Sequence, residues 1–239
     1  MNTEITYEKF FKSMFWKEAT REDIVNAIKC GADIYACNGL NRTPMHFAAG
    51  YSSSGEVIDF FLEREIDVSA CDFMNATPLH YAAAHSETPE VVKKLLDKVK
   101  GTYKEMYRTA DFPTKSGLTP LHCAVKSSKS LEVIRLFLDY EADSNAADKH
   151  GNTPMHYAAR SFRASEEVIE LLIVKEANPN NMNCYKKTPE DYIKRNSNLT
   201  PKKKQHILKT LEDYDQILDK YYCDELGHIP SNGHFLPKK

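Results

Sequence analysis

Apolar residues between Thr77 and Lys100 form two short helical stripes with a polar break between them. Leu79, Ala82 and Ala83 have the i, i+3, i+4 spacing of the buried side of a helix. The polar segment 85–89 interrupts the pattern, and a second apolar stripe follows, made of Val91, Val92, Leu95 and Leu96. The pattern predicts a pair of helices, the first thin because of its alanines and the second bulkier.

The same pair of stripes recurs along the chain, each time after the phrase Thr-Pro-(Leu/Met)-His. Threonine is a good residue for a helix N-cap, and proline suits the first helical position that follows it. The copies begin 34, 42 and 34 residues apart: Thr43-Pro44-Met45-His46, Thr77-Pro78-Leu79-His80, Thr119-Pro120-Leu121-His122 and Thr153-Pro154-Met155-His156. The second helices of the other pairs are predicted around residues 57–62, 131–137 and 168–172.

Two kinds of turn separate the predicted helices. A phrase of the Gly-Ala-Asp type follows each second helix: Gly31-Ala32-Asp33, Glu65-Ile66-Asp67, Glu141-Ala142-Asp143 and Glu176-Ala177-Asn178. If the three glutamates adopt the left-handed conformation that glycine favours there, each costs about 1 kcal/mol relative to glycine. Hairpin tips are predicted at 38–42, 72–76, 114–118 and 148–152, with Gly39, Gly117 and Gly151 supplying the turn chemistry.

The recurring phrase, its period and the turn that follows it resemble the ankyrin repeat over about residues 20–195. The resemblance implies an all-α repeat solenoid of stacked helix-turn-helix units with β-hairpin loops. We expect about five repeats, at approximately 37–70, 71–112, 113–146, 147–181 and 182–200. N-terminal capping helices are expected within 1–36, and a C-terminal capping helix, from Pro201 to about Tyr222, with a tail within 201–239.

The 42-residue step carries eight more residues than the other two steps. Val99, Tyr103, Met106 and Tyr107 continue the apolar spacing of the helix that contains Leu96, and Gly101 is a weak point within it. Two interpretations stay open for this Val99–Tyr107 extension. It packs on the next outer helix, or it protrudes as an edge rich in Tyr and Met that engages a partner.

Composition and charge exclude several classes of protein. Hydrophobic residues make up 41% and charged residues 28% of the chain, as in a folded globular protein, and the net charge of −2 gives no basic field for nucleic acid. The sequence has neither an apolar run long enough to span a membrane nor a signal-peptide pattern. We therefore expect a cytoplasmic protein, although delivery into a host cell without a cleaved signal would look the same. Because capping helices are expected at both ends of the array, we also expect a monomer.

No residue set in the sequence predicts catalysis, a metal or another cofactor. Equivalent histidines on stacked helices lie about 8–10 Å apart, too far to share one zinc ion. The resemblance instead gives His46, His80, His122 and His156 a structural role, with bonds to the neighbouring threonine and to backbone. Cys223, His228 and His234 in the tail lack a fourth ligand, and the lysine run 202–204 is read as a solvated helix start.

The resemblance also implies a site for a partner protein, on the hairpin tips and the exposed positions of the inner helices along a concave face. Phe73 and Met74 are the most informative of these residues, since apolar side chains on a tip have no core to fill. The tip residues implied are Leu40, Asn41, Arg42, Phe73, Met74, Asn75, Lys115, Ser116, Lys149, His150, Tyr185 and Lys186, and the helix residues are Tyr51, His85, Lys126 and Arg160.

Two functions follow from these observations. The first is a non-enzymatic scaffold or adaptor that binds an unidentified protein. The alternative is a pathogen effector that acts on host proteins, with any activity residing in the C-terminal tail, 223–239. The ends outside the repeats are too small for an independent catalytic core, which favours the first function.

Overall fold

The computed structural model describes residues 9–100, 109–127, 130–161 and 166–218. Within these ranges the chain forms helices joined by turns, and no described residue lies in a strand. Five inner helices line up in one column: α4 (Pro44–Tyr51), α6 (Pro78–His85), α8 (Pro120–Ser127), α10 (Pro154–Arg160) and α12 (Pro189–Arg195). Five outer helices form a second column: α5 (Gly55–Leu62), α7 (Pro89–Lys100), α9 (Leu131–Asp139), α11 (Glu166–Val174) and α13 (Pro201–Glu212).

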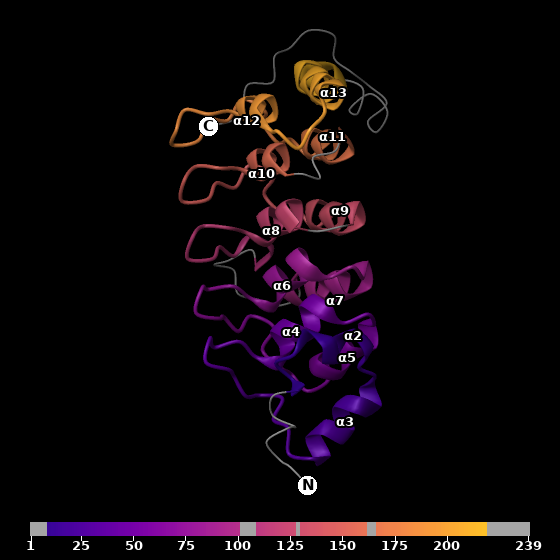
Figure 1. The fold of residues 1–239 in the computed structure, drawn as a ribbon. Coiled ribbons are helices and arrows are strands. Elements are labelled where there is room, and N and C mark those ends of the chain that lie inside the picture. Colours follow the sequence, from indigo (N-terminus) through magenta and orange to yellow (C-terminus); the bar gives the residue numbers. More distant parts are fainter. Residues whose placement is uncertain (1–8, 101–108, 128–129, 162–165, 219–239) are drawn as a thin grey trace.

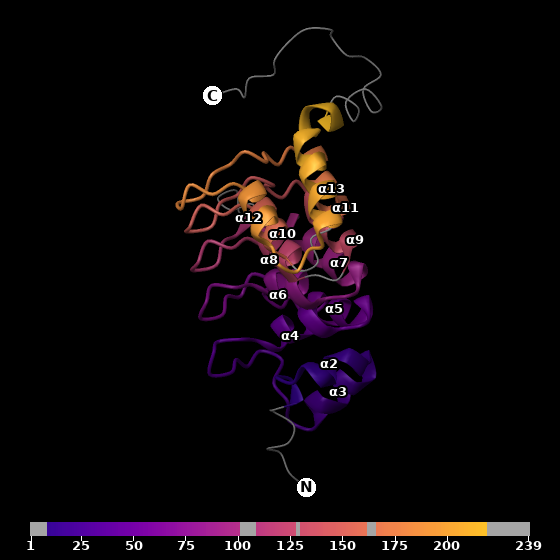
Figure 2. The ribbon, with the colours of Figure 1, turned by 45° about the horizontal axis from the view of Figure 1, so that its top comes forward.

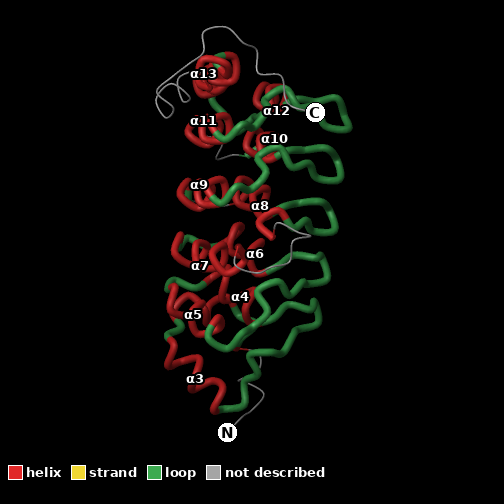
Figure 3. The backbone as a smooth tube through the Cα atoms, turned by 180° about the vertical axis from the view of Figure 1, so that it is seen from behind, coloured by secondary structure: helices red, strands yellow, loops and turns green. Residues whose placement is uncertain are grey.

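The two columns stack into an elongated array whose long loops, which contain the hairpin tips, project to the same side (Figure 1). Figure 2 shows the same order of helices from a tilted view, and Figure 3 shows from behind that the turns leave the array on the side of the inner helices. Each unit packs mainly against its neighbours in sequence, as expected for a solenoid. The predicted repeat fold is confirmed.

Small residues allow the inner helices to approach one another. Ala48, Ala49, Ala82 and Ala83 are fully buried between α4 and α6, and the paired alanines of α10 are buried likewise. The outer helices supply the bulk of the core, with the largest buried side chains including Phe60, Phe61, Phe137, Leu95 and Leu96. This division follows the apolar pattern of the sequence, in which thin and bulky helices alternate.

Aromatic residues close the N-terminal end of the array. Trp16 on α2 (Ser13–Glu18) is fully buried, and its indole N–H donates to the Phe10 carbonyl at 2.9 Å. Its ring lies 5.7 Å from that of Phe61 on α5. Helix α3 (Arg21–Lys29) follows and begins with a capping box between Thr20 and Asp23. The 3-10 turn η1 (Thr109–Asp111) precedes the third tip.

The structure corrects one expectation about helix ends, and most of a second one lies outside the described residues. The helix that begins at Pro201 ends at Glu212, with Asp213 as its C-cap, and residues 214–218 are helical again, so the single helix predicted here is interrupted at Asp213. The predicted end near Tyr222 lies outside the described residues. Helix α7 extends to Lys100 and buries Val99, but the rest of the Val99–Tyr107 extension lies outside the described residues.

The turns after the outer helices adopt the expected left-handed conformation. Glu65, Glu141 and Glu176 have φ angles of 54°, 61° and 62°, and Gly31 occupies the equivalent position at 97°. At the hairpin tips, the left-handed residues are Asn41, Asn75, Gly117, Gly151 and Lys186. The prediction that Gly39 supplies the first tip's turn chemistry is therefore wrong, because Asn41, two residues later, takes the left-handed position.

Candidate partner-binding surface

Each tip is a five-residue turn that its own first residue holds closed. In the second tip, the Asp72 N–H donates to the Ala76 carbonyl at 2.9 Å. The Asp72 carboxylate accepts from the N–H groups of Met74 at 2.8 Å and of Ala76 at 2.9 Å. Asn38, Asp148 and Asn183 do the same in their tips, and the Thr114 hydroxyl accepts from the Leu118 N–H. Side chains of Asp and Asn are well suited to such turns.

Backbone hydrogen bonds join the tips into one ladder. The N–H of the second residue of a tip donates to the carbonyl of the third residue of the preceding tip. The bonds are Phe73 to Leu40 at 3.0 Å, Lys115 to Met74 at 2.8 Å, Lys149 to Ser116 at 3.0 Å and Cys184 to His150 at 2.9 Å. The exposed side chains of the tips are therefore held at fixed intervals along the array.

The four motif histidines bond each repeat to the next. The Thr77 N–H donates to Nδ1 of His80 at 3.1 Å, so the ring proton lies on Nε2, which donates to the Leu118 carbonyl at 3.1 Å. His46, His122 and His156 make the same pair of bonds, reaching the carbonyls of Ala76, Asn152 and Lys187. In the last repeat Asp191 replaces the histidine: its carboxylate accepts from the Thr188 N–H and has no donor that could bond a carbonyl of a following repeat.

Burial keeps these histidines neutral. Desolvation lowers the pKa of His46, His122 and His156, and it lowers the pKa of His80 to about 4. A protonated ring would also place a donor at Nδ1, where the threonine N–H already donates. The histidines are thus suited to a fixed structural bond at neutral pH and not to proton transfer.

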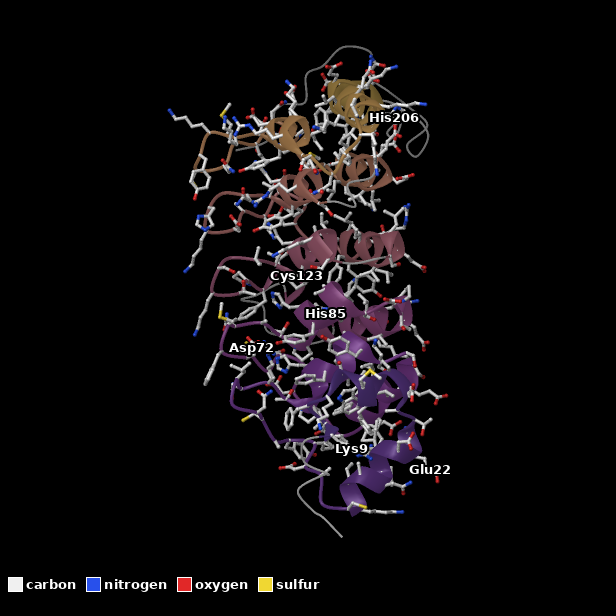
Figure 4. The ribbon with its side chains drawn as sticks, in the orientation of Figure 1. Lys9, Glu22, Asp72, His85, Cys123 and His206 are labelled. Carbon is white, nitrogen blue, oxygen red and sulfur yellow. The ribbon has the colours of Figure 1, made fainter. Side chains whose placement is uncertain are left out.

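Tyrosines on the inner helices connect the tips to the helix surface. The Tyr81 hydroxyl donates to Asp72 at 3.0 Å, and the Tyr157 hydroxyl donates to Asp148 at 2.8 Å. Burial would raise the pKa of Asp72, but hydrogen bonds from Ala76, Tyr81 and Met74 outweigh it and lower the pKa. Burial, together with the nearby carboxylate, raises the pKa of Tyr81. Figure 4 labels Asp72 on the side of the tips and His85 on the inner column.

We define the tip face as the five tips, the fifth of which is 183–187, together with the C-terminal ends of the inner helices. The ring of Tyr81 lies 6.2 Å from that of His85, which stacks on Tyr51 at 5.2 Å. The Arg42 guanidinium lies 5.4 Å from the centre of the Tyr81 ring. These contacts make the tip face continuous from the base of the tips to the helix ends.

Most of the residues predicted to bind a partner are exposed on the tip face. Leu40, Phe73, Met74 and Tyr185 expose 50%, 58%, 55% and 63% of their surface, although all four are apolar or aromatic. The other predicted residues that are exposed are Asn41, His85, Lys115, Ser116, Lys126, Lys149, His150, Arg160 and Lys186, and those that are half-buried are Arg42, Tyr51 and Asn75.

Two of the predicted residues also hold adjacent repeats together. The Asn41 side-chain amide donates to the Cys71 carbonyl at 2.7 Å, and that of Asn75 donates to the Pro113 carbonyl at 3.0 Å. Their φ angles of 57° and 62° place them in the left-handed position of the tip. A substitution at either asparagine would therefore disturb the junction between repeats as well as any partner contact.

Sequence reasoning missed the residues that support the tip face. Tyr81, Tyr157 and Tyr192 occupy the same position of the inner helices α6, α10 and α12, and each bonds the first residue of a tip. The signal was present, because each of the three stands one residue after the motif histidine or its replacement, Asp191. Arg195, which was left out of the residues predicted to bind a partner, is exposed and equivalent in position to Lys126 and Arg160.

Within the described ranges, no group of three or more histidine, cysteine, aspartate or glutamate side chains is arranged to hold a metal ion. Among the same residues, no helix combines the length and the apolar character needed to cross a membrane. Cys223, His228 and His234, considered above as a partial metal or catalytic set, lie outside the described part of the chain.

Comparison with known proteins agrees with this geometry. A family profile described as ankyrin repeats (3 copies) matches residues 16–107 and 102–183, which is most of the chain. The chain therefore belongs to the ankyrin-repeat family. Ankyrin repeats generally mediate protein–protein interaction, and the family is typically non-enzymatic.

Among curated proteins, the chain is similar to ankyrin-containing fem-1 homologues. It is 34% identical over 91 residues to protein fem-1 homolog A of Rattus norvegicus, which covers 33% of this chain and 14% of that protein. The same protein of Homo sapiens is also 34% identical over 91 residues, covering 33% of this chain and 13% of the human protein. The match thus spans about a seventh of the length of these relatives.

Proposed function

We propose that this chain is a non-enzymatic interaction module that binds a partner protein on its tip face. The observation that carries this proposal is the set of exposed apolar side chains on adjacent, hydrogen-bonded tips. Leu40, Phe73 and Met74 each expose at least half of their surface while their backbone is fixed by the ladder. Exposed apolar groups on a fixed backbone lose little backbone entropy when a partner covers them.

The remaining expectations from the sequence belong to this proposal. We infer that the protein acts as a monomer in the cytoplasm and that its partner is a protein, without nucleic acid or membrane. Delivery into a host cell as an effector is the alternative, with activity in the tail. A chain ending near Tyr222 that still binds its partner supports the first function, whereas loss of a measurable turnover on truncation supports the alternative.

Replacing Phe73 and Met74 by alanine tests the proposal. The double variant Phe73→Ala, Met74→Ala should keep the melting temperature of the wild type, because neither side chain fills the core. Capture of a partner from lysate should fall by about tenfold or more, since a central apolar contact contributes about 1–2 kcal/mol or more to binding.

The matched control is Met14→Ala, which removes a side chain that is 68% exposed on α2, away from the tips. It should leave capture at the wild-type level. Equal capture by wild type, control and double variant would show that the first two tips are not the binding site.

A further inference from the structure

The chemistry of the tip face changes along the array. The first two tips present Leu40, Phe73 and Met74, whereas the third and fourth present Lys115 and Lys149 at the position of Phe73. The C-terminal ends of the inner helices change at the same junction. Tyr51 and His85 form the stacked pair of the first two repeats, and the exposed cations that follow at successive helix ends are Lys126, Arg160 and Arg195.

Exposed acidic groups are missing from all five tips. The only carboxylates in them are those of Asp72 and Asp148, which are buried and bonded to the turn and to a tyrosine. The chain as a whole has 34 acidic and 32 basic residues, so its negative charge is placed elsewhere. At the other turns, for example, Glu65, Glu141 and Glu176 are exposed. The tip face is therefore cationic although the protein has a small net negative charge.

From this charge pattern we infer the chemistry of the partner: an extended acidic peptide segment with a bulky apolar residue near one end. The inference rests on the proposed function and specifies what occupies that surface. The apolar residue lies against Leu40, Phe73 and Met74, and the carboxylates lie along the exposed cations of the later repeats, which run from Lys115, Lys126, Lys149 and Arg160 to Lys186 in the fifth tip. Such a segment matches both halves of the tip face, whereas a basic or wholly apolar one would match at most one half.

The spacing of the repeats fixes the length of the segment. Packed helices lie about 8–10 Å apart, so the second and fifth tips are separated by about 30 Å. An extended chain advances about 3.3 Å per residue, which gives about nine residues between the apolar anchor and the last cation. A segment of about twelve residues therefore spans the surface.

A selection experiment tests this inference while the partner is still unidentified. The full chain is immobilised and used to select from a random library of peptides about twelve residues long. We expect the recovered peptides to be enriched in Asp and Glu, with a Phe, Leu, Ile or Trp near the same end. Their binding should weaken when salt is raised from about 50 mM to about 300 mM, because the contacts with exposed lysines are screened.

Charge reversal on the tip face provides the second arm. The variant Lys115→Glu, Lys149→Glu should bind the recovered peptides at least about tenfold more weakly, since two attractive contacts become repulsive. Lys126 and Arg160 are left in place because they also lie against the rings of Tyr157 and Tyr192. The control variant Lys93→Glu, Lys209→Glu makes the same change in net charge on the outer helices and should bind as the wild type does.

The outcomes separate this inference from the proposed function. Neutral or basic peptides that bind and respond to Phe73→Ala, Met74→Ala would leave the interaction module standing and overturn the acidic partner. Recovery of no peptide above background would overturn the acidic peptide partner but not the interaction module, which the capture from lysate tests separately. The inference would also be overturned by a single-stranded oligonucleotide of equal length that binds more tightly than the recovered peptides and is released by the Lys115→Glu, Lys149→Glu variant.

Discussion

The first two tips and the next two have the same backbone but differ at the junctions between repeats. Tips 38–42 and 72–76 place an asparagine in the left-handed position and use its amide to reach the next repeat. Tips 114–118 and 148–152 place Gly117 and Gly151 there, with the backbone of the next tip close by. An added Cβ at Gly117 would lie 2.7 Å from the Lys149 nitrogen.

The comparison shows that the fold and the recognition surface depend on different residues. We call the repeats of tips 38–42 and 72–76 the first half and those of tips 114–118 and 148–152 the second half. The backbone closure of each tip, the ladder between tips and the histidine bonds are the same in both halves. In most repeats the side chains of the exposed second and third tip residues take no part in these bonds. At these positions the chemistry changes from apolar in the second tip to cationic in the third and fourth tips, and the fifth tip presents Tyr185. A solenoid can therefore change its partner while keeping its stack.

The largest expected effect comes from breaking the close approach in the second half. Gly117→Ala adds a Cβ to a residue with φ of 84° and into contact with Lys149. Left-handed strain of about 1–2 kcal/mol and overpacking of about 1–3 kcal/mol together predict that the free energy of unfolding falls by about 2–5 kcal/mol. Urea unfolding followed by circular dichroism measures this loss.

Asn75→Ala is the matched variant in the first half. Asn75 already carries a Cβ at a φ of 62°, so alanine loses mainly the hydrogen bond to Pro113, worth about 1 kcal/mol. A cost for Gly117→Ala no larger than that for Asn75→Ala would mean that the two junctions pack in the same way.

The next effect concerns the bond at the boundary between the halves, from His80 to the third tip. The pKa of His80 is lowered from 6.5 to about 4 by burial, so below pH 6.5 the unfolded chain binds a proton that the folded chain does not. Stability should fall as pH decreases from about 6.5 to about 4. At about 1.4 kcal/mol per pKa unit, His80 alone should lower the free energy of unfolding by about 3 kcal/mol over this pH range.

His80→Gln identifies this contribution. The variant should be less stable at pH 7 but should show a shallower decrease between pH 6.5 and pH 4, measured by urea unfolding at a series of pH values. Hydrogen bonds lower the pKa values of Asp72 and Asp148 from 3.8, so protonation of these carboxylates weakens the fold only at lower pH. Parallel profiles for wild type and variant would show that His80 titrates alike in the folded and unfolded chains.

The sequence predicted the fold well because the repeat carries its own local signals. The Thr-Pro pairs begin α4, α6, α8 and α10 as expected, and the apolar stripes of α5, α7, α9 and α11 become the core. The turn at Glu141 was also predictable, since its position in the repeat requires a left-handed residue. Each of these predictions uses residues within a few positions of one another.

The support of the tip face was harder to predict because it depends on contacts between repeats. Nothing near Asn41 in the sequence indicates that its amide reaches Cys71, 30 residues later. Gly39 attracted the prediction because glycine is the usual turn residue, yet Asn41 adopts the positive φ and gains this hydrogen bond. The partner-binding role of the exposed residues stays a prediction, because exposure shows which side chains a partner can reach and does not identify the partner.

The smallest expected effect tests whether the two halves are alike at the turns that follow the outer helices. Glu65 and Glu141 occupy the same left-handed turn position in the first and second halves, with φ angles of 54° and 61°. Replacing either glutamate by glycine removes strain of about 1–2 kcal/mol but makes the unfolded chain more flexible. The free energy of unfolding should therefore rise by about 0.5–1 kcal/mol. Differential scanning calorimetry of Glu65→Gly and Glu141→Gly should show a similar small rise in melting temperature for both.

Gly31→Ala is the reverse change at a site with φ of 97° and no neighbour within 4 Å of the added Cβ, so it should lower the melting temperature through strain alone. A gain in only one half would extend the contrast between the halves from the tips to the outer turns.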